Sequence, residues 1–144
     1  VCVVLTADCV PVVLAARNGA AVAALHAGWR GVAAGILDAG VAALASVGAL
    51  EAWVGPAISA THYEVGDDVR TALLSADPRF ARRFQPAGRS HWMADLPGMV
   101  HDRLRELGVA SVTLSALCSF ADSRFYSYRR DTVTGRNATL VWLE

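Results

Sequence analysis

Short apolar runs dominate the start of the chain. Valine, alanine and leucine fill residues 1–5, 10–16 and 20–26, and continuous apolar runs of this length are typical of strands buried in a sheet. Asn18 and Gly19 separate the last two runs, and this dipeptide favours the tight turn of a β-hairpin. The beginning of the sequence therefore predicts three strands, of which the second and third form a hairpin.

The hydrophobic pattern changes further along the chain. Residues 31–48 contain a single charged residue, Asp38, and predict a buried helix. Residues 51–58 predict a short strand. Apolar side chains in residues 65–76 and 96–107 recur at helical spacing, and each of these segments predicts an amphipathic helix.

The remaining segments are less regular. Residues 77–90 are rich in arginine and predict a loop or lid, whereas residues 109–117 predict a further strand. Residues 124–143 predict a loop or strand, a turn at residues 133–137 and a terminal strand. We find no internal repeat, low-complexity tract or linker, so we predict a single α+β domain over residues 1–144.

Composition narrows the classes of function. The chain has 144 residues, 54% hydrophobic and 18% charged, which excludes a disordered protein. Thirteen basic and thirteen acidic residues give zero formal charge, so we expect no nucleic-acid partner and no membrane partner. Three cysteines without a CxxC pair favour a reducing compartment, and we expect a cytoplasmic protein. Since residues 1–5 already form an apolar strand, we expect an N-terminal part to be missing before Val1.

The hairpin brings a thiol and an imidazole onto one face. With a two-residue turn at Asn18 and Gly19, His26 lies opposite Pro11 and shares a face with Cys9. Their Cβ atoms would be about 7 Å apart, and a zinc ion at about 2.3 Å from sulfur and 2.0 Å from nitrogen bridges that span. Because proline cannot donate to the ladder, we expect the ladder to open at this end.

Residues after the hairpin add an anion site. The sequence "AGWRGV" leads directly into the predicted helix, so the N–H groups near Gly31 and the guanidinium of Arg30 would attract phosphate or carboxylate. A zinc ion or His26 beside Cys9 would lower the pKa of its thiol. We therefore expect Cys9 to be the most reactive of the three cysteines.

Each of these residues also has a purely structural interpretation. Cys9 fits a small buried side chain, and His26 fits a hydrogen bond to a main-chain carbonyl. We interpret Trp29 and Cys118 as packing residues. Asp8 either orients a metal ligand or caps the turn.

Four segments carry a resemblance to a known family. In this order, "TADCVPVVL", "ALHAGWRG", "GPAISATHYEVGDDV" and "CSFADSRFYSYRRDTVTGRNATLVWL" resemble motifs of the YfiH-like laccase-domain family, also described as the purine nucleoside phosphorylase or peptidoglycan editing factor family. The resemblance covers almost the whole chain and implies mixed sheets flanked by helices, in an α/β/β/α arrangement. It also implies a zinc site of two histidines and one cysteine, with Cys9 and His26 as two of the ligands. The third ligand lies upstream of these motifs in the family, and His62, His91 and His101 are not good substitutes for it.

The resemblance also implies an activity. It points to phosphorolysis of adenosine, inosine or methylthioadenosine and to zinc-assisted deamination of adenosine. Arg30, Arg129 and Arg136 are then candidate contacts for phosphate or nucleoside, and Glu64 is the candidate acid or base. The alternatives are a peptidoglycan-precursor editing amidase, a copper-dependent polyphenol oxidoreductase, and an inactive fragment or binding module. Four histidines are too few for a multicopper centre, so we favour zinc over copper.

Overall fold

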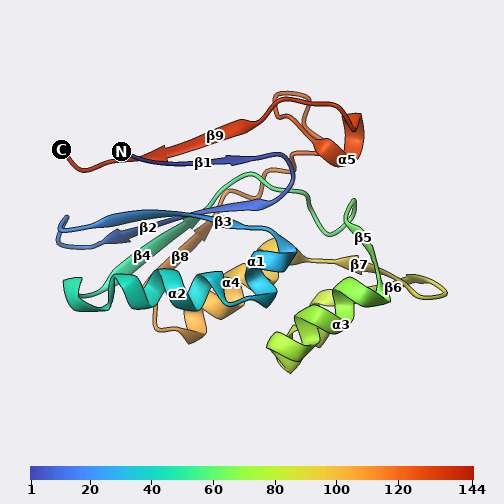
Figure 1. Cartoon of the computed structure of the whole chain (residues 1–144), viewed down its shortest axis with the longest axis horizontal. Coiled ribbons are helices and arrows are strands. Elements are labelled where there is room, and N and C mark those ends of the chain that lie inside the picture. Colours follow the sequence, from blue (N-terminus) through green and yellow to red (C-terminus); the bar gives the residue numbers. More distant parts are fainter.

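A mixed four-stranded sheet forms the centre of the computed structural model, which describes residues 1–144. Its strands, in spatial order, are β3 (Val22–Ala27), β2 (Val10–Ala16), β4 (Leu50–Val54) and β8 (Ser111–Leu114). The pairs β3–β2 and β2–β4 are antiparallel, and β4–β8 is parallel. A separate antiparallel pair, β1 (Cys2–Thr6) with β9 (Asn137–Val141), is called the ribbon below. Figure 1 shows the ribbon lying over one face of the four-stranded sheet.

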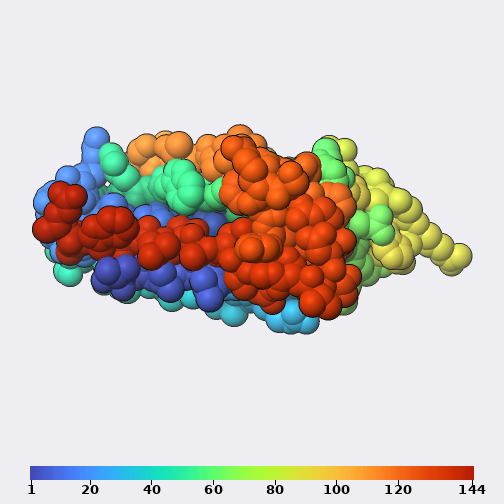
Figure 2. Space-filling model, turned by 90° about the horizontal axis from the view of Figure 1, so that it is seen from above, coloured from blue at the N-terminus to red at the C-terminus, as the bar shows by residue number.

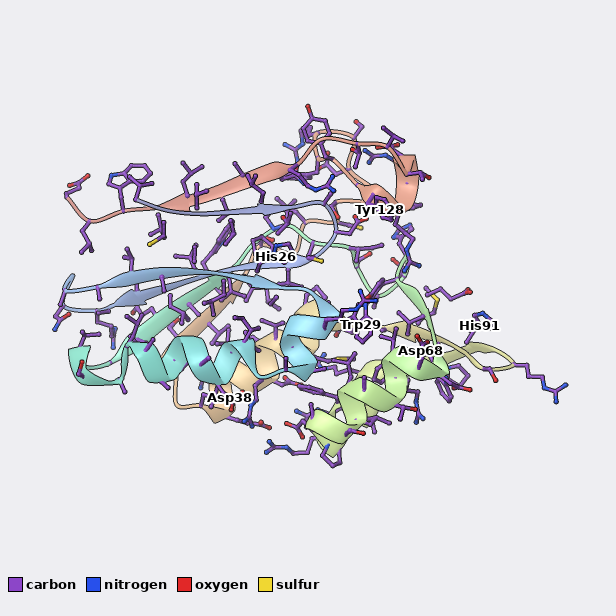
Figure 3. The ribbon with its side chains drawn as sticks, in the orientation of Figure 1. His26, Trp29, Asp38, Asp68, His91 and Tyr128 are labelled. Carbon is purple, nitrogen blue, oxygen red and sulfur yellow. The ribbon has the colours of Figure 1, made fainter.

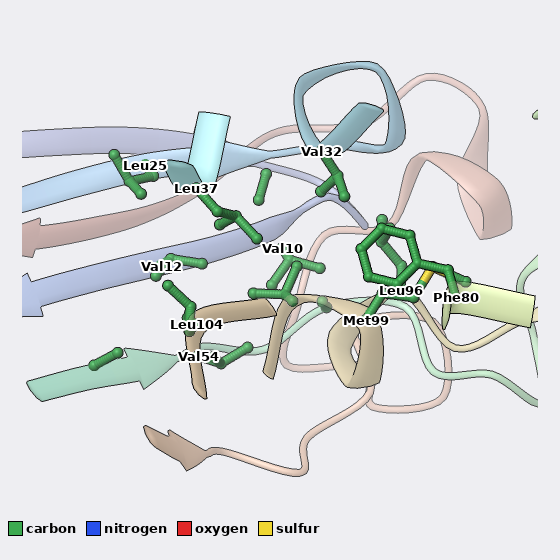
Figure 4. Packing of buried hydrophobic residues seen from close by; sticks show 14 of the residues in the cluster. Val10, Val12, Leu25, Val32, Leu37, Val54, Phe80, Leu96, Met99 and Leu104 are labelled. Carbon is green, nitrogen blue, oxygen red and sulfur yellow. The ribbon is translucent and has the colours of Figure 1, made fainter. Parts of the chain in front are cut away.

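Helices cover the opposite face of this sheet (Figure 1). They are α1 (Trp29–Ala33), α2 (Ile36–Ala43) and α4 (Leu96–Glu106). Alternate side chains of β2, such as Val10 and Val12, are fully buried, and Figure 4 shows them packed near Leu37 of α2 and Leu104 of α4. The layers are therefore helices, mixed sheet and ribbon, which confirms the predicted α+β class.

A smaller antiparallel sheet extends beyond one end of the central sheet. It is formed by β5 (Glu64–Gly66), β7 (His91–Ala94) and β6 (Phe84–Gly88). The neighbouring elements are α3 (Asp67–Ala76) and the 3-10 helix η2 (Pro78–Arg83). Two short elements complete the chain, the 3-10 helix η1 (Ala45–Val47) and α5 (Tyr128–Asp131).

Three of the predicted elements were wrong in detail. The helix predicted for residues 31–48 is broken at Gly35, whose φ of 82° lies in the left-handed region that glycine adopts without strain. The helix predicted for residues 65–76 begins only at Asp67, because Val65 belongs to β5 and pairs with Trp92. Residues 77–90 are not a loop or lid, since they contain η2, β6 and the turn into β7.

The predicted register of the hairpin is confirmed, but its turn is longer than predicted. Pro11 pairs with His26, while the main-chain N–H of Ala16 donates to Ala21 at 2.9 Å, which leaves a four-residue loop between them. Ladder bonds alternate along antiparallel strands, so Pro11 falls at a position that makes none with β3. Its carbonyl instead accepts from Gly55 at 2.9 Å. The expected opening of the ladder at Pro11 is wrong, because the pairing of β2 with β3 continues to Val10 opposite Ala27.

The outer surface of the ribbon is apolar and exposed. Figure 2 shows β1 and β9 side by side on this face of the molecule, next to the segment that leads into α5. Val3 and Leu140 are paired across the ribbon and are 52% and 51% exposed. None of the helices combines the length and hydropathy that crossing a bilayer would need.

Candidate functional site

Cys9 and His26 lie on the side of the central sheet that faces the ribbon. Leu25 is buried against the helices, so the next residue of β3, His26, points the opposite way. Figure 3 shows His26 between the central sheet and the ribbon. Cys9 is two residues before Pro11, the partner of His26, and therefore shares its face.

Gly28 lies directly against the side chains of Cys9 and His26. A Cβ atom at this position would lie 2.8 Å from Cys9 Sγ and 3.9 Å from His26 Cδ2. Any other residue would displace the sulfur, so glycine is required for Cys9 to occupy this place. A thiol and an imidazole that meet over one glycine are donors of the types that zinc binds. No third histidine, cysteine, aspartate or glutamate of the chain completes a three-residue metal site with them.

Asp8 connects Cys9 to two distant segments. Its carboxylate accepts hydrogen bonds of 2.7 Å from the Ser119 hydroxyl and 2.7 Å from the Arg129 main-chain N–H. Its carbonyl accepts a further bond from Ile58 at 3.0 Å. The φ of Asp8 is 88°, a strained value for a residue with a side chain, which the surrounding hydrogen bonds must stabilise. Asp8 therefore fixes the position of the adjacent thiol.

A cleft of about 490 Å³ opens beside Cys9 and His26. Its aromatic walls are Trp29, Tyr63 and Tyr128. Figure 3 shows Trp29 on α1 and Tyr128 on α5 at the same end of the molecule. The family resemblance placed Arg129 near the site, but the sequence did not single out Tyr63 and Tyr128, because their places in the cleft depend on how α5 folds onto the start of β2.

Two arginines in the cleft have no carboxylate partner. Arg30 stacks 4.4 Å from the centroid of Trp29, and Arg129 lies 5.2 Å from that of Tyr63. Arg129 also donates to the carbonyl of Glu64 at 2.7 Å. The salt bridges of the chain involve other arginines. Both guanidinium groups are thus held by aromatic rings and available to an anion.

Burial changes the ionisation of two cleft residues. It raises the pKa of Tyr63 to about 12, against a smaller opposing effect of Arg129, so this hydroxyl stays protonated and can donate. Burial and then the Asp8 carboxylate raise the pKa of Cys9, partly offset by Arg136. This direction is opposite to our expectation that Cys9 ionises readily in the metal-free protein.

Other candidates lie outside the cleft. The guanidinium of Arg136 donates to the carbonyls of Thr134 and Gly135, at 3.1 and 2.8 Å. The side chain of Glu64 is exposed and does not line the cleft. Of the other histidines, His91 contacts the Arg89 carbonyl at 2.9 Å.

A second and larger cleft, of about 570 Å³, lies next to η2. Its two arginines are Arg82 and Arg83, and both form salt bridges with Asp102. Arg83 also pairs with Asp95. With these charges already neutralised, the second cleft lacks the available cations of the first.

The comparisons with known proteins cover nearly the whole chain. The family described as multi-copper polyphenol oxidoreductase laccase matches residues 1–144. A "Purine nucleoside phosphorylase" of Pseudomonas aeruginosa is 46% identical over 99% of the chain and 60% of its own length. "Purine nucleoside phosphorylase YfiH" of Escherichia coli is 41% identical over 99% of the chain and 59% of its own length.

Solved structures show the same relationship. A crystal structure from Neisseria meningitidis has a TM-score of 0.93 at 42% identity, covering 99% of this chain and 60% of that one. The YlmD structure from Geobacillus stearothermophilus has a TM-score of 0.85 at 29% identity, covering 94% and 54%. The chain thus spans about 60% of the length of the curated relatives it matches. Since the likeness extends over all 144 residues in sequence and nearly all in structure, the chain belongs to the YfiH-like laccase family.

Proposed function

We propose that the protein is a zinc-dependent purine nucleoside phosphorylase that accepts adenosine, inosine and methylthioadenosine and also deaminates adenosine. The observation that carries this proposal is the cleft in which aromatic side chains and two available arginines adjoin Cys9 and His26. A purine is a flat aromatic ligand and phosphate is an anion, so this cleft suits both substrates. The names of the relatives support the phosphorylase part of this proposal. We expect the enzyme to act in the cytoplasm on small molecules.

In the proposed phosphorolysis, residues of the chain have separate roles. Tyr128 offers an exposed ring to the purine, and Tyr63 offers a protonated hydroxyl as a donor. Arg30 and Arg129 hold phosphate so that one of its oxygens attacks C1′ of the ribose. The C1′–N bond breaks, its electron pair leaves with the base, and ribose 1-phosphate forms. Glu64, through its carbonyl, helps to hold Arg129 in position.

Cys9 and His26 would hold the zinc ion, which when bound supplies a Lewis acid. Two protein donors are fewer than the three of an ordinary catalytic zinc site. The family resemblance assigns the third ligand to a part of the relatives that this chain does not cover. We propose Asp8 as the residue that orients Cys9 toward the metal, because it is fixed by Ser119 and Arg129.

The test is to measure release of the purine base by the protein at its natural length as phosphate is varied. We expect release to require phosphate and to yield ribose 1-phosphate. The Arg30→Ala variant should raise the KM for phosphate about tenfold, a modest loss for a charged contact because the side chain is exposed. Arg17→Ala is the matched control, since Arg17 pairs with Glu51 on the surface. Base release without phosphate would refute the proposal.

The family description makes a polyphenol oxidoreductase the competing function. Such an enzyme would consume oxygen with phenols and contain copper, whereas the proposed phosphorylase would contain zinc and consume no oxygen. Metal analysis and oxygen uptake on the same preparation separate the two.

A further inference from the structure

A second cysteine and histidine pair lies where two chain segments run side by side beyond β4 and β8. Ala57 forms an isolated parallel bridge with Cys118. The N–H of Ala57 donates to Leu117 at 3.3 Å, and the N–H of Ser119 donates back to Ala57 at 3.0 Å. This bridge brings Cys118 next to Ser59 and the residues that follow it.

The sulfur of Cys118 is surrounded by polar groups. It lies 3.7 Å from Nδ1 of His62 and accepts a hydrogen bond from the main-chain N–H of Ser59 at 3.4 Å. The imidazole stacks on Phe120, with 4.6 Å between ring centroids and 24° between the planes. The hydroxyls of Ser59 and Thr61 lie 3.1 and 3.0 Å from the same Nδ1 atom. The histidine ring is therefore held in a fixed place beside the thiol.

These contacts change the chemistry of the thiol. Burial alone would raise the pKa of Cys118, but hydrogen bonds from Ser59 and from the backbone at Ala121 and Phe120 outweigh it and lower the pKa. The side chain is only partly buried, so small reagents can reach it. Reactive cysteines combine these properties, a stabilised thiolate and access to solvent.

We propose that Cys118 is a site of reversible oxidation by hydroperoxides, with His62 as its proton acceptor and donor. His62 takes the thiol proton, and the thiolate attacks one peroxide oxygen. An S–O bond forms and the O–O bond breaks, so sulfur loses two electrons and becomes a sulfenic acid. The departing oxygen takes the proton from His62 and leaves as water or an alcohol. Two equivalents of a small thiol restore Cys118 and yield one disulfide and water.

The other two cysteines lack this environment. Cys2 Sγ approaches only the carbonyl of Val22, at 3.9 Å, and a carbonyl cannot stabilise a thiolate. Cys9 is adjacent to the Asp8 carboxylate, which opposes ionisation. The proposed oxidation site is independent of the proposed phosphorylase function, because it is measured by chemistry at sulfur alone.

The experiment treats the protein at its natural length with hydrogen peroxide and dimedone, and quantifies the adduct at each cysteine by mass spectrometry. We expect Cys118 to be modified about fivefold or more faster than Cys2. His62→Gln should slow the modification of Cys118 and move its pH profile upward. His91→Gln is the matched control, because His91 lies in β7, remote from Cys118, and its side-chain hydrogen bond is to the Arg89 carbonyl.

Two results would overturn the proposal. One is modification of Cys118 no faster than of Cys2 in the wild-type protein. The other is an equal rate at Cys118 in the His62→Gln and His91→Gln variants. Thermal unfolding confirms that each variant is folded, and if His62→Gln does not fold, the wild-type pH profile decides. The pH at which Cys118 reacts at half its maximal rate must then be lower in the folded protein than in the same protein unfolded in urea.

Discussion

The two cysteine and histidine pairs of this protein consist of the same residue types in opposite environments. Cys9 and His26 come from neighbouring strands of one hairpin, whereas Cys118 and His62 are 56 residues apart in sequence. Burial and then the adjacent Asp8 carboxylate raise the pKa of the first thiol, whereas at the second thiol hydrogen-bond donors outweigh burial and lower the pKa. The difference shows that burial, neighbouring charges and N–H groups, more than the presence of a histidine, decide how readily each thiol ionises.

The two pairs are also physically linked. Ser119 directly follows Cys118, Asp8 directly precedes Cys9, and the hydroxyl of Ser119 donates to Asp8 at 2.7 Å. A substitution at this link should therefore affect the first pair through its positioning, while substitutions within one pair should leave the other intact.

The largest expected effect separates the roles of the two pairs. Cys9→Ser or His26→Ala should abolish zinc binding and purine nucleoside turnover, because either change removes a proposed metal donor. Cys118→Ser, the matched control, should leave both unchanged. Metal analysis and base release on the same preparations check this. Full zinc content in the Cys9 variant would contradict the metal assignment.

The next largest effect is expected at Asp8, whose hydrogen bond with Ser119 links the two pairs. Asp8→Ala removes the acceptor of two hydrogen bonds, so we expect a loss of about 2–4 kcal/mol in the free energy of unfolding, together with reduced turnover. Chemical denaturation measures the first quantity. Asp122→Ala is the control, because Asp122 pairs with Arg124 on the surface and should contribute little. Equal stability of the two variants would show that Asp8 does not organise the site.

A smaller effect is expected from substitution of Gly28, which lies against Cys9 and His26. In Gly28→Ala the new methyl group would lie 2.8 Å from Cys9 Sγ, so the sulfur must move. We expect metal affinity to fall about tenfold, with Cys118 reacting with peroxide as before. Titration with a competing chelator measures the affinity. Unchanged metal affinity would mean that the position of the sulfur over Gly28 does not matter for binding.

The smallest effect is one of pH. In the metal-free protein the alkylation rate of Cys118 should reach half its maximum at a lower pH than that of Cys9, because rates follow the thiolate fraction. Since zinc must displace the proton of Cys9, whose pKa is raised, zinc affinity should increase as pH rises through neutrality. Labelling from pH 6 to 10 and zinc titration at two pH values test these directions. A reversed order of the two midpoints would contradict the structure.

Local signals in the sequence determined much of the fold. The apolar run of β2 and the Asn18–Gly19 turn predicted the register that pairs Pro11 with His26. A shift of one residue would turn the buried side chains of a strand to the opposite face of the sheet, so the burial pattern excludes it. The apolar spacing of residues 96–107 predicted α4, and Gly108, with φ of 83°, ends it. The shared face of Cys9 and His26 follows from this register.

Only the tertiary structure decided the features that depend on long-range contacts. The strands β6 and β7 carry no regular alternation of apolar and polar residues, and they form because β7 pairs with β6 on one side and with β5 on the other. Arg129 and Tyr128 reach the cleft because α5 is held to Asp8. Cys118 meets His62 through a bridge between segments far apart in the chain. Hydrophobic periodicity records which face of an element is buried, but it carries no record of which distant segment will lie beside that element.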